Sequence, residues 1–265
     1  MGRFVARLRL LPFLLLPFLL AAGVAGAATL DDVIKRGTVK VGIDLGVPPY
    51  GLTDANQKPA GYDVEVSELF AKDLGVKLEI VPVTGPNRVP FLLTNKVDVV
   101  IATFGITPQR ALSVSFSNPY VALSLVVLGP KDKPIANMAE TKGMKVGITR
   151  GTTQDLDFTR LAPEGSQIVR FEDDATTTAA MLSGQVDIIA TADLLATEIA
   201  KRNPQKNLDI KFTIRLSPGA IGVRRGDADF LQWVNTFVYF HKLNGDFARL
   251  FEKWAGYKMP ELPVF

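Results

Sequence analysis

The sequence predicts an α/β protein with two lobes of similar build. Strand-like and helix-like segments alternate along residues 30–102, an order typical of a parallel sheet with helices on its faces. Two strand strings recur in the same order: residues 40–43 return at 145–148, and residues 97–103 return at 186–191. Chance similarity of short apolar strings is the alternative, and the matching order argues against it. A unit that occurs only twice indicates two lobes, not a solenoid.

Residues 1–27 have the features of a Sec-type signal peptide. Three arginines precede an apolar run at residues 10–20, and Ala25-Gly26-Ala27 offers a small-x-small cleavage pattern. We expect cleavage after Ala27 or Ala28. Because two prolines interrupt the apolar run and it is too short for a good membrane anchor, an uncleaved anchor is the less favoured interpretation.

Composition narrows the class of protein. The whole chain has 30 basic and 27 acidic residues, so loss of the three N-terminal arginines leaves a formally neutral chain, which gives no reason to expect nucleic acid as a partner. About 240 mature residues suit two lobes of about a hundred residues each. The chain has no cysteine and a single histidine, His241, so we expect no disulfide scaffold, no metal, no cofactor and no Ser-His-Asp hydrolase site.

The elements of the first lobe follow from β-branched runs for strands and a 3.6-residue apolar period for helices. Asp63 is expected to cap the second helix and Gly75 to end it. The predicted elements are, in order, a helix at 30–36, a strand at 38–43, a loop at 44–51, a turn or hairpin at 54–61, a helix at 63–75, a strand at 78–83, a helix at 87–95 and a strand at 97–102.

Two apolar stretches are expected to cross between the lobes, residues 121–128 outward and residues 212–223 on the return. Lobe 1 would then comprise residues 28–118 plus 220–265, and lobe 2 residues 119–219.

The remaining elements are assigned in the same way. They are strands at 145–148, 167–171 and 186–191, helices opening at Gly151, at Asp173 or Asp174 and at 194, and two final helices at 227–241 and from 246. In the last helix, Phe247, Leu250, Phe251 and Trp254 follow helical spacing and are expected to pack in the core.

Residues 103–110 join a buried strand to a short helix. Thr107 is expected to be the N-cap and Pro108 the first helical residue, which puts Arg110 at the third position. A cation there opposes the helix dipole by about 0.3–1 kcal/mol, which makes sense if an anion binds the same free N–H groups. An arginine that reaches a nearby carboxylate, or lies in solvent, explains this stretch equally well.

Ligands of open α/β sheets bind beyond the carboxyl ends of the strands. Thr103 and Gly105 would offer a hydroxyl and an unobstructed backbone there, and Thr152 and Thr153 would offer a helix N-terminus and two hydroxyls. As an isolated motif, Gly-Thr-Thr is usually only a helix cap. The four loops that would line one cleft are 44–51, 103–110, 149–154 and 190–194.

Two further side chains are candidates with open alternatives. Tyr50, after two prolines, would form an aromatic wall or merely fill a turn. Asp193 would pair with a ligand ammonium group or merely cap the helix that follows it. An anion clamp on one side and a carboxylate on the other suit a zwitterion such as an amino acid.

The chain resembles the bacterial extracellular solute-binding proteins of family 3, the polar amino-acid-binding proteins of ABC importers. The resemblance implies a fold like the type II periplasmic binding proteins: two α/β lobes joined by two crossover strands, with a ligand cleft that closes by a hinge. The matching strings are residues 36–42, 48–51, 61–64, 87–90, 107–110, 116–120, 151–153 and 183–187.

The resemblance also implies site roles. Arg110 corresponds to the family's bidentate partner for the ligand α-carboxylate. Thr103 and Gly105 correspond to residues of the same pocket, and Thr152 and Thr153 to residues that close on the carboxylate from the second lobe.

Three positions depart from the family pattern. Ala192 stands where the family has its ammonium-binding aspartate, and Asp193 follows one residue later. Gly105 lacks a hydroxyl that is frequent in the family, and Val47 stands where several members have an aromatic ring. These departures weaken the expectation of a standard α-amino acid and leave a carboxylate-bearing ligand favoured.

We therefore expect a monomeric periplasmic binding protein, without catalytic residues, that delivers an amino acid or related small carboxylate to an ABC transporter permease. The alternative is a periplasmic cyclohexadienyl dehydratase on the same scaffold, to which the family resemblance also extends. Its substrate prephenate has no amino group, so the absence of the ammonium-binding aspartate would be consistent with that activity. Asp44 and Asp193 are the candidate general acids for that alternative.

Overall fold

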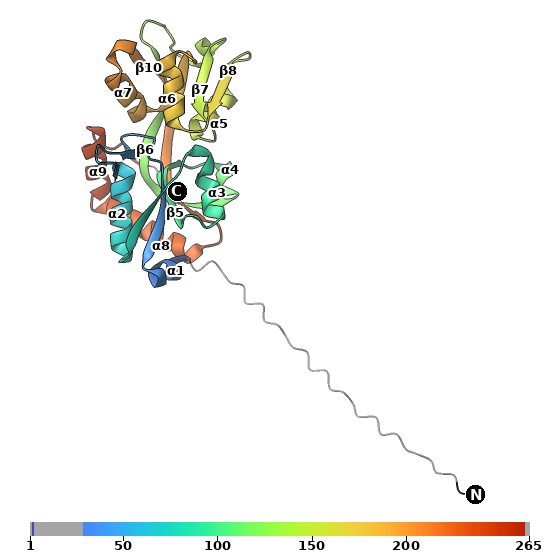
Figure 1. Ribbon diagram of the computed structural model, residues 1–265, viewed down its shortest axis with the longest axis vertical. Coiled ribbons are helices and arrows are strands. Elements are labelled where there is room, and N and C mark those ends of the chain that lie inside the picture. Colours follow the sequence, from blue (N-terminus) through green and yellow to red (C-terminus); the bar gives the residue numbers. More distant parts are fainter. Residues whose placement is uncertain (1, 3–28, 263–265) are drawn as a thin grey trace.

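The computed structural model describes Gly2 and residues 29–262, and the rest of the predicted signal peptide lies outside the described residues. Figure 1 shows helices and strands in two groups, a lower and an upper lobe, with β6 (Val114–Pro130) and β10 (Leu208–Arg224) running between them. In the described part, no helix has the length and apolar character needed to cross a bilayer.

The lower lobe takes its elements from both ends of the chain. In order, they are α1 (Thr29–Arg36), β1 (Thr38–Ile43), the short pair β2 (Leu52–Thr53) and β3 (Pro59–Ala60), α2 (Tyr62–Leu74), β4 (Lys77–Pro82), α3 (Arg88–Leu93), β5 (Val99–Gly105), α4 (Pro108–Ala111), α8 (Ala228–Leu243) and α9 (Asp246–Ala255).

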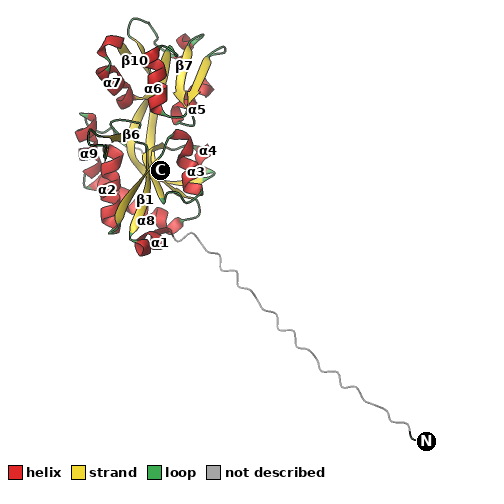
Figure 2. Ribbon diagram, viewed as in Figure 1, coloured by secondary structure: helices red, strands yellow, loops and turns green. Residues whose placement is uncertain are grey.

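The upper lobe is a continuous part of the chain with helices on its strands (Figure 2). Its elements are β7 (Lys145–Thr149), α5 (Thr153–Leu161), β8 (Gln167–Phe171), α6 (Asp174–Ser183), β9 (Ile188–Ala192) and α7 (Asp193–Arg202).

One mixed sheet, in the order β4-β1-β5-β10-β6-β9-β7-β8, passes through both lobes. Within the lower lobe β1 pairs in parallel with β4 and β5, and within the upper lobe β7 pairs in parallel with β8 and β9. The crossing strands β6 and β10 are antiparallel to each other and to the strands beside them. The predicted arrangement of two similar α/β lobes joined by two crossover strands is therefore confirmed.

The recurring strings occupy equivalent places in the two lobes. Asp98 accepts a hydrogen bond from the backbone N–H of Lys40 at 2.7 Å, and Asp187 accepts one from Lys145 at 2.8 Å. Asp98 thus holds β1 beside β5 in the lower lobe, and Asp187 holds β7 beside β9 in the upper lobe.

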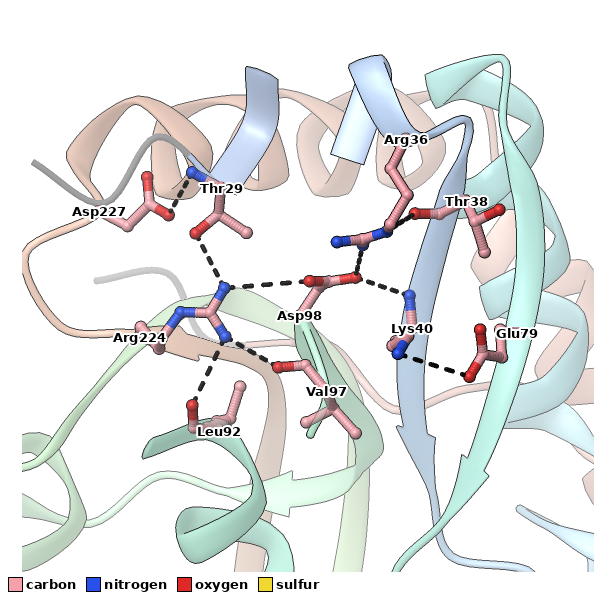
Figure 3. A network of polar contacts seen from close by, with 10 residues as sticks. All are labelled: Thr29, Arg36, Thr38, Lys40, Glu79, Leu92, Val97, Asp98, Arg224 and Asp227. Atoms are coloured by element: carbon pink, nitrogen blue, oxygen red, sulfur yellow. Dashed lines mark hydrogen bonds and ion pairs between the residues drawn. The ribbon is translucent and has the colours of Figure 1, made fainter. Parts of the chain in front are cut away.

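A polar network joins α1, the amino end of β5 and the carboxyl end of β10 in the lower lobe (Figure 3). Asp98, at the amino end of β5, lies between the guanidinium groups of Arg36 and Arg224. Arg224 also donates to Thr29 Oγ1 at 2.9 Å, and the Thr29 N–H donates to Asp227 at 3.3 Å. Because these groups sit at the opposite ends of the strands from the predicted ligand loops, we assign the network to stability.

Several predicted boundaries need correction. The helix expected to be capped by Asp63 begins at Tyr62, and Gly61 takes the cap position with φ +122°, a conformation that favours glycine. The side chain of Asp63 turns inward instead and accepts a hydrogen bond from Tyr120 Oη at 2.6 Å. The crossing strands are longer than predicted, because β6 and β10 pair with each other along their whole length.

Other boundaries agree with the sequence. The helix α2 ends before Gly75, as predicted, and in α9 Phe247, Leu250 and Phe251 are buried. The predicted lobe boundaries at 118/119 and 219/220 fall inside β6 and β10 and stay a prediction.

Candidate ligand-binding cleft

Arg110 lies where the two lobes meet. Thr107 caps α4 by accepting a hydrogen bond from the Arg110 N–H at 3.2 Å, as the sequence predicted. The buried guanidinium donates from Nη1 to the Gly105 carbonyl, and from Nη2 to the Gly151 carbonyl at 2.7 Å in the upper lobe. The side chain therefore contacts backbone carbonyls, neither a carboxylate nor bulk solvent.

The charged form of Arg110 is destabilised by its surroundings. Burial, and to a smaller extent the nearby cation Arg88, lower the pKa of Arg110 to about 9. Burial makes the charged form of Arg110 unfavourable, and an anion beside its guanidinium would stabilise that form. This environment favours the binding of a carboxylate.

A cavity of about 20 Å³ lies between the lobes. That volume accommodates about one water molecule, so a larger molecule can enter only if the lobes separate. Both lobes line it, with Val47, Arg88, Thr103, Leu123, Thr152, Thr153, Gln154, Asp174 and Ala192. Thr103, Thr152 and Thr153, all predicted site residues, thus lie around one space.

Gly105 lies against the opposite lobe. A Cβ atom built there would come 2.5 Å from Thr153 Cγ2, far inside normal contact distance. The missing hydroxyl at this position therefore has a steric reason: glycine lets the two lobes approach this closely.

Thr103 has an unusual backbone and a buried support. Its φ is +45°, which is rare for a β-branched residue and is found at functional sites more than elsewhere. The Thr103 N–H donates to Tyr120 Oη at 3.0 Å, and Tyr120 in turn donates to Asp63. Burial raises the pKa of Asp63 to about 7.

Arg88 and Asp44 form a buried ion pair that the sequence reasoning missed. Arg88 Nη2 donates to Asp44 Oδ2 at 2.8 Å, and both side chains are about 5% exposed. The Nε of Arg88 is buried without a hydrogen-bond partner among the described residues. The available signal was the string 87–90 in the family resemblance, which could have marked Arg88 as a cleft residue.

Asp174 is the acidic residue on the cavity wall, and the sequence left its role open. The structure gives the cap of α6 to Asp173, which accepts a hydrogen bond from the Thr176 N–H at 2.7 Å. Asp174 is thereby free to face inward, where Thr149 Oγ1 donates to it at 2.9 Å. Burial, then the charge of Asp44, raise the pKa of Asp174 to about 7.

Of the predicted site residues, Tyr50, Gly105, Arg110 and Asp193 are not among those that line the cavity, whereas Val47 and Ala192 do line it. Tyr50 is buried and packs edge-on against Tyr62, with ring centroids 6.4 Å apart. Asp193 is not the N-cap of α7 but its first residue. There its carboxylate accepts hydrogen bonds from the Leu194 N–H at 2.9 Å and from Tyr257 Oη at 3.4 Å.

Sequence comparison places the chain among known binding proteins. The model of the bacterial extracellular solute-binding proteins, family 3, matches residues 39–257. The L-cystine-binding protein TcyJ of Escherichia coli (strain K12) is 27% identical over 234 residues, 88% of this chain and 88% of that protein. The glutamine-binding protein of Geobacillus stearothermophilus is 30% identical over 203 residues, 75% of this chain and 77% of that protein.

Solved structures agree. A solute receptor for L-cysteine of Neisseria gonorrhoeae superposes with a TM-score of 0.80 and 35% identity, over 86% of this chain and 93% of that one. The ancestral amino acid-binding protein AncCDT-1, described as a precursor of cyclohexadienyl dehydratase, superposes with a TM-score of 0.77 and 32% sequence identity, over 86% of this chain and 100% of that one. These neighbours are named as binding proteins, not enzymes. The chain belongs to the bacterial extracellular solute-binding proteins, family 3.

Proposed function

We propose that this protein captures an amino acid or a related small carboxylate in the cleft between its lobes and delivers it to an ABC transporter permease. The observation that carries the proposal is the buried guanidinium of Arg110, which reaches the Gly151 carbonyl across the cleft. The similar proteins named above bind cystine, glutamine and cysteine, which supports an amino acid as the ligand.

In this proposal the lobes separate, and the guanidinium of Arg110 exchanges its two carbonyl partners for the two oxygens of a ligand carboxylate. A bidentate, charge-assisted pair is stronger than two bonds to neutral carbonyls, so the exchange is favourable. The N-terminus of α5, where Thr152 is the cap, adds free N–H groups from the other lobe. Closure then brings both sets of donors onto one anion.

The closed form is proposed to dock on the permease as a monomer. The periplasm is the proposed location, since the signal peptide expected at residues 1–27 would export the chain. Arg110 and the α5 N-terminus belong to different lobes, so a bound carboxylate favours the closed form by contacts that the open form cannot make.

The dehydratase alternative receives no support from either of its candidate acids. Asp44 is held in an ion pair with Arg88, and Asp193 does not line the cavity. We therefore do not propose a catalytic role for this cleft.

Calorimetry on the mature protein tests the proposal. The panel is L-arginine, L-glutamine, L-cystine and L-histidine, each beside the same molecule without its α-amino group, together with small dicarboxylates. We expect at least one ligand to bind and Arg110→Ala to weaken it by about a hundredfold or more. Arg150→Ala is the matched control, because Arg150 neighbours Gly151 but is exposed and paired with Glu172. No binding by the panel, or undiminished binding by Arg110→Ala, would overturn the proposal.

A further inference from the structure

The cavity wall carries one acidic and one basic side chain among its lining residues, Asp174 and Arg88. They come from different lobes and have different surroundings. Arg88 has its charge balanced by Asp44, a 2.8 Å partner in its own lobe. Among the ion pairs of the described residues, none includes Asp174.

Asp174 is fixed in position by the start of α6. Asp173 provides the cap, so the following carboxylate does not have to satisfy the helix N-terminus. Thr149 Oγ1 donates to Asp174 Oδ1 at 2.9 Å and also lies 2.9 Å from Thr177 Oγ1. Asp174 is 5% exposed, so it is a buried carboxylate with a defined orientation and one neutral hydrogen-bond donor.

A buried carboxylate without an ion-pair partner is unfavourable, and the charge of Asp44 makes this one more so, while the charge of Arg88 favours its ionised form to a smaller extent. The same space is lined by the apolar residues Val47, Leu123 and Ala192 and by neutral polar side chains, so Asp174 is the one carboxylate among the described lining residues. A positive group that enters the cavity would supply the missing partner.

We propose that Asp174 accepts the ammonium group of the ligand, so that the cleft selects zwitterions over simple carboxylates. The inference rests on the proposed function, because it assumes that the carboxylate of the same ligand lies on Arg110. Arg110 and the α5 N-terminus form the end of the site that binds the carboxylate, and Asp174, whose charged neighbours are Asp44 and Arg88, forms the end that binds the ammonium group. A second carboxylate beside Asp174 would meet like charge, which disfavours dicarboxylates.

The raised pKa of Asp174 gives a further signature. A cation binds the ionised form, so at a pH below about 7 the ligand has to displace a proton from this carboxyl. The affinity for a zwitterion should therefore rise between pH 6 and pH 8, and this rise should disappear when the carboxyl is replaced by an amide.

The test compares Asp174→Asn with wild type by calorimetry on the amino-acid panel and its deaminated partners. Asparagine keeps the shape and the contact with Thr149 but removes the charge. We expect the tightest amino acid to bind about thirtyfold more weakly, while its deaminated partner is unaffected. Asp173→Asn is the matched control, since asparagine still caps α6 and the side chain is partly exposed and is not among the cavity-lining residues; it should bind as wild type does.

The outcomes separate the two proposals. Equal binding of amino acids by wild type and Asp174→Asn, together with a loss in Arg110→Ala, overturns the role of Asp174 and leaves the proposed function standing. No binding of any ligand by wild type overturns both. If Asp174→Asn does not fold, wild type decides alone: a deaminated partner that binds as tightly as its amino acid overturns the inference.

Discussion

Arg110 Nη2 lies 2.7 Å from the carbonyl oxygen of Gly151, and this hydrogen bond joins the two lobes directly across the cleft. The two residues are 41 positions apart in the chain: Arg110 belongs to α4 of the lower lobe, and Gly151 to the loop before α5 of the upper lobe. The same guanidinium therefore serves the closed form and, in our proposal, the ligand. Changes around this contact should alter closure and binding together.

Gly105→Ala should impair closure without unfolding either lobe. Its Cβ would lie 2.5 Å from Thr153 Cγ2, so the lobes could not approach as closely as they do. We expect the ligand affinity to fall by about tenfold or more. In small-angle scattering, the radius of gyration of the variant with ligand should be larger than that of the wild type with ligand.

The companion variant Gly105→Ala with Thr153→Ser removes the methyl group that the new Cβ meets. Part of the lost affinity should return in this double variant. Wild-type affinity in the single variant would contradict the steric explanation.

The variants Thr103→Gly and Thr103→Ala distinguish the effect of backbone strain at this position from the effect of the threonine hydroxyl. Both remove the hydroxyl and should weaken ligand binding to a similar degree. Because φ is +45° at this position, glycine fits the backbone and alanine does not, so the glycine variant should be more stable by about 1 kcal/mol. Urea unfolding measures this difference, and equal stability of the two variants would show that the backbone here is not strained.

Asp44→Asn should be strongly destabilising. It leaves the charge of Arg88 buried without its 2.8 Å partner, a situation that costs about 3–5 kcal/mol in buried ion pairs. The double variant Asp44→Asn with Arg88→Met removes both charges and should recover most of the loss in thermal or urea unfolding without ligand. If the double variant is as unstable as the single one, packing and not charge explains the effect.

Because of the raised pKa of Asp63, we expect the free energy of unfolding to fall as the pH rises. Burial raises its pKa to about 7 in the folded protein, against about 4 in an unfolded chain, so between these values the folded state binds more protons. Stability from this group is greatest below about pH 4 and declines through pH 7. Asp63→Asn keeps an acceptor for Tyr120 and should reduce the fall in unfolding free energy between pH 5 and pH 8, while the part that comes from Asp174 remains. A wild-type slope in this variant would assign the pH dependence to other groups.

Much of the lower lobe could be predicted because its signals are local. Thr107, Pro108 and Arg110 specify a capped helix start within four residues, and the structure has that start. The cleft residues that escaped prediction depend on distant partners. Arg88 is held in the cleft by its ion pair with Asp44, 44 positions away, and nothing in the sequence near either residue indicates that the two side chains meet.

Asp173 and Asp174 show a different limit. Either aspartate can cap the helix by its type and position, and only the side chain's direction separates the cap from the residue that faces the cavity. Asp193 is a related case: a carboxylate at a helix start suggests a cap, but Ala192 takes that position and Asp193 bonds to Leu194 and Tyr257. Side-chain direction depends on where an element begins, which sequence patterns locate within one or two residues.

The crossing strands β6 and β10 have a mechanical consequence. Their register runs from the pair Leu208 and Pro130 to the pair Arg224 and Val114, so they form one continuous ribbon and not two independent linkers. The register shifts at several places, and we expect the ribbon to bend at the two shifts on either side of Ala220, because Ala220 pairs with Phe104 at the end of β5 beside the cleft. Opening and closing should then reduce to a single coordinate, the bend of that ribbon. A transporter that senses the spacing of the lobes would thereby read one angle.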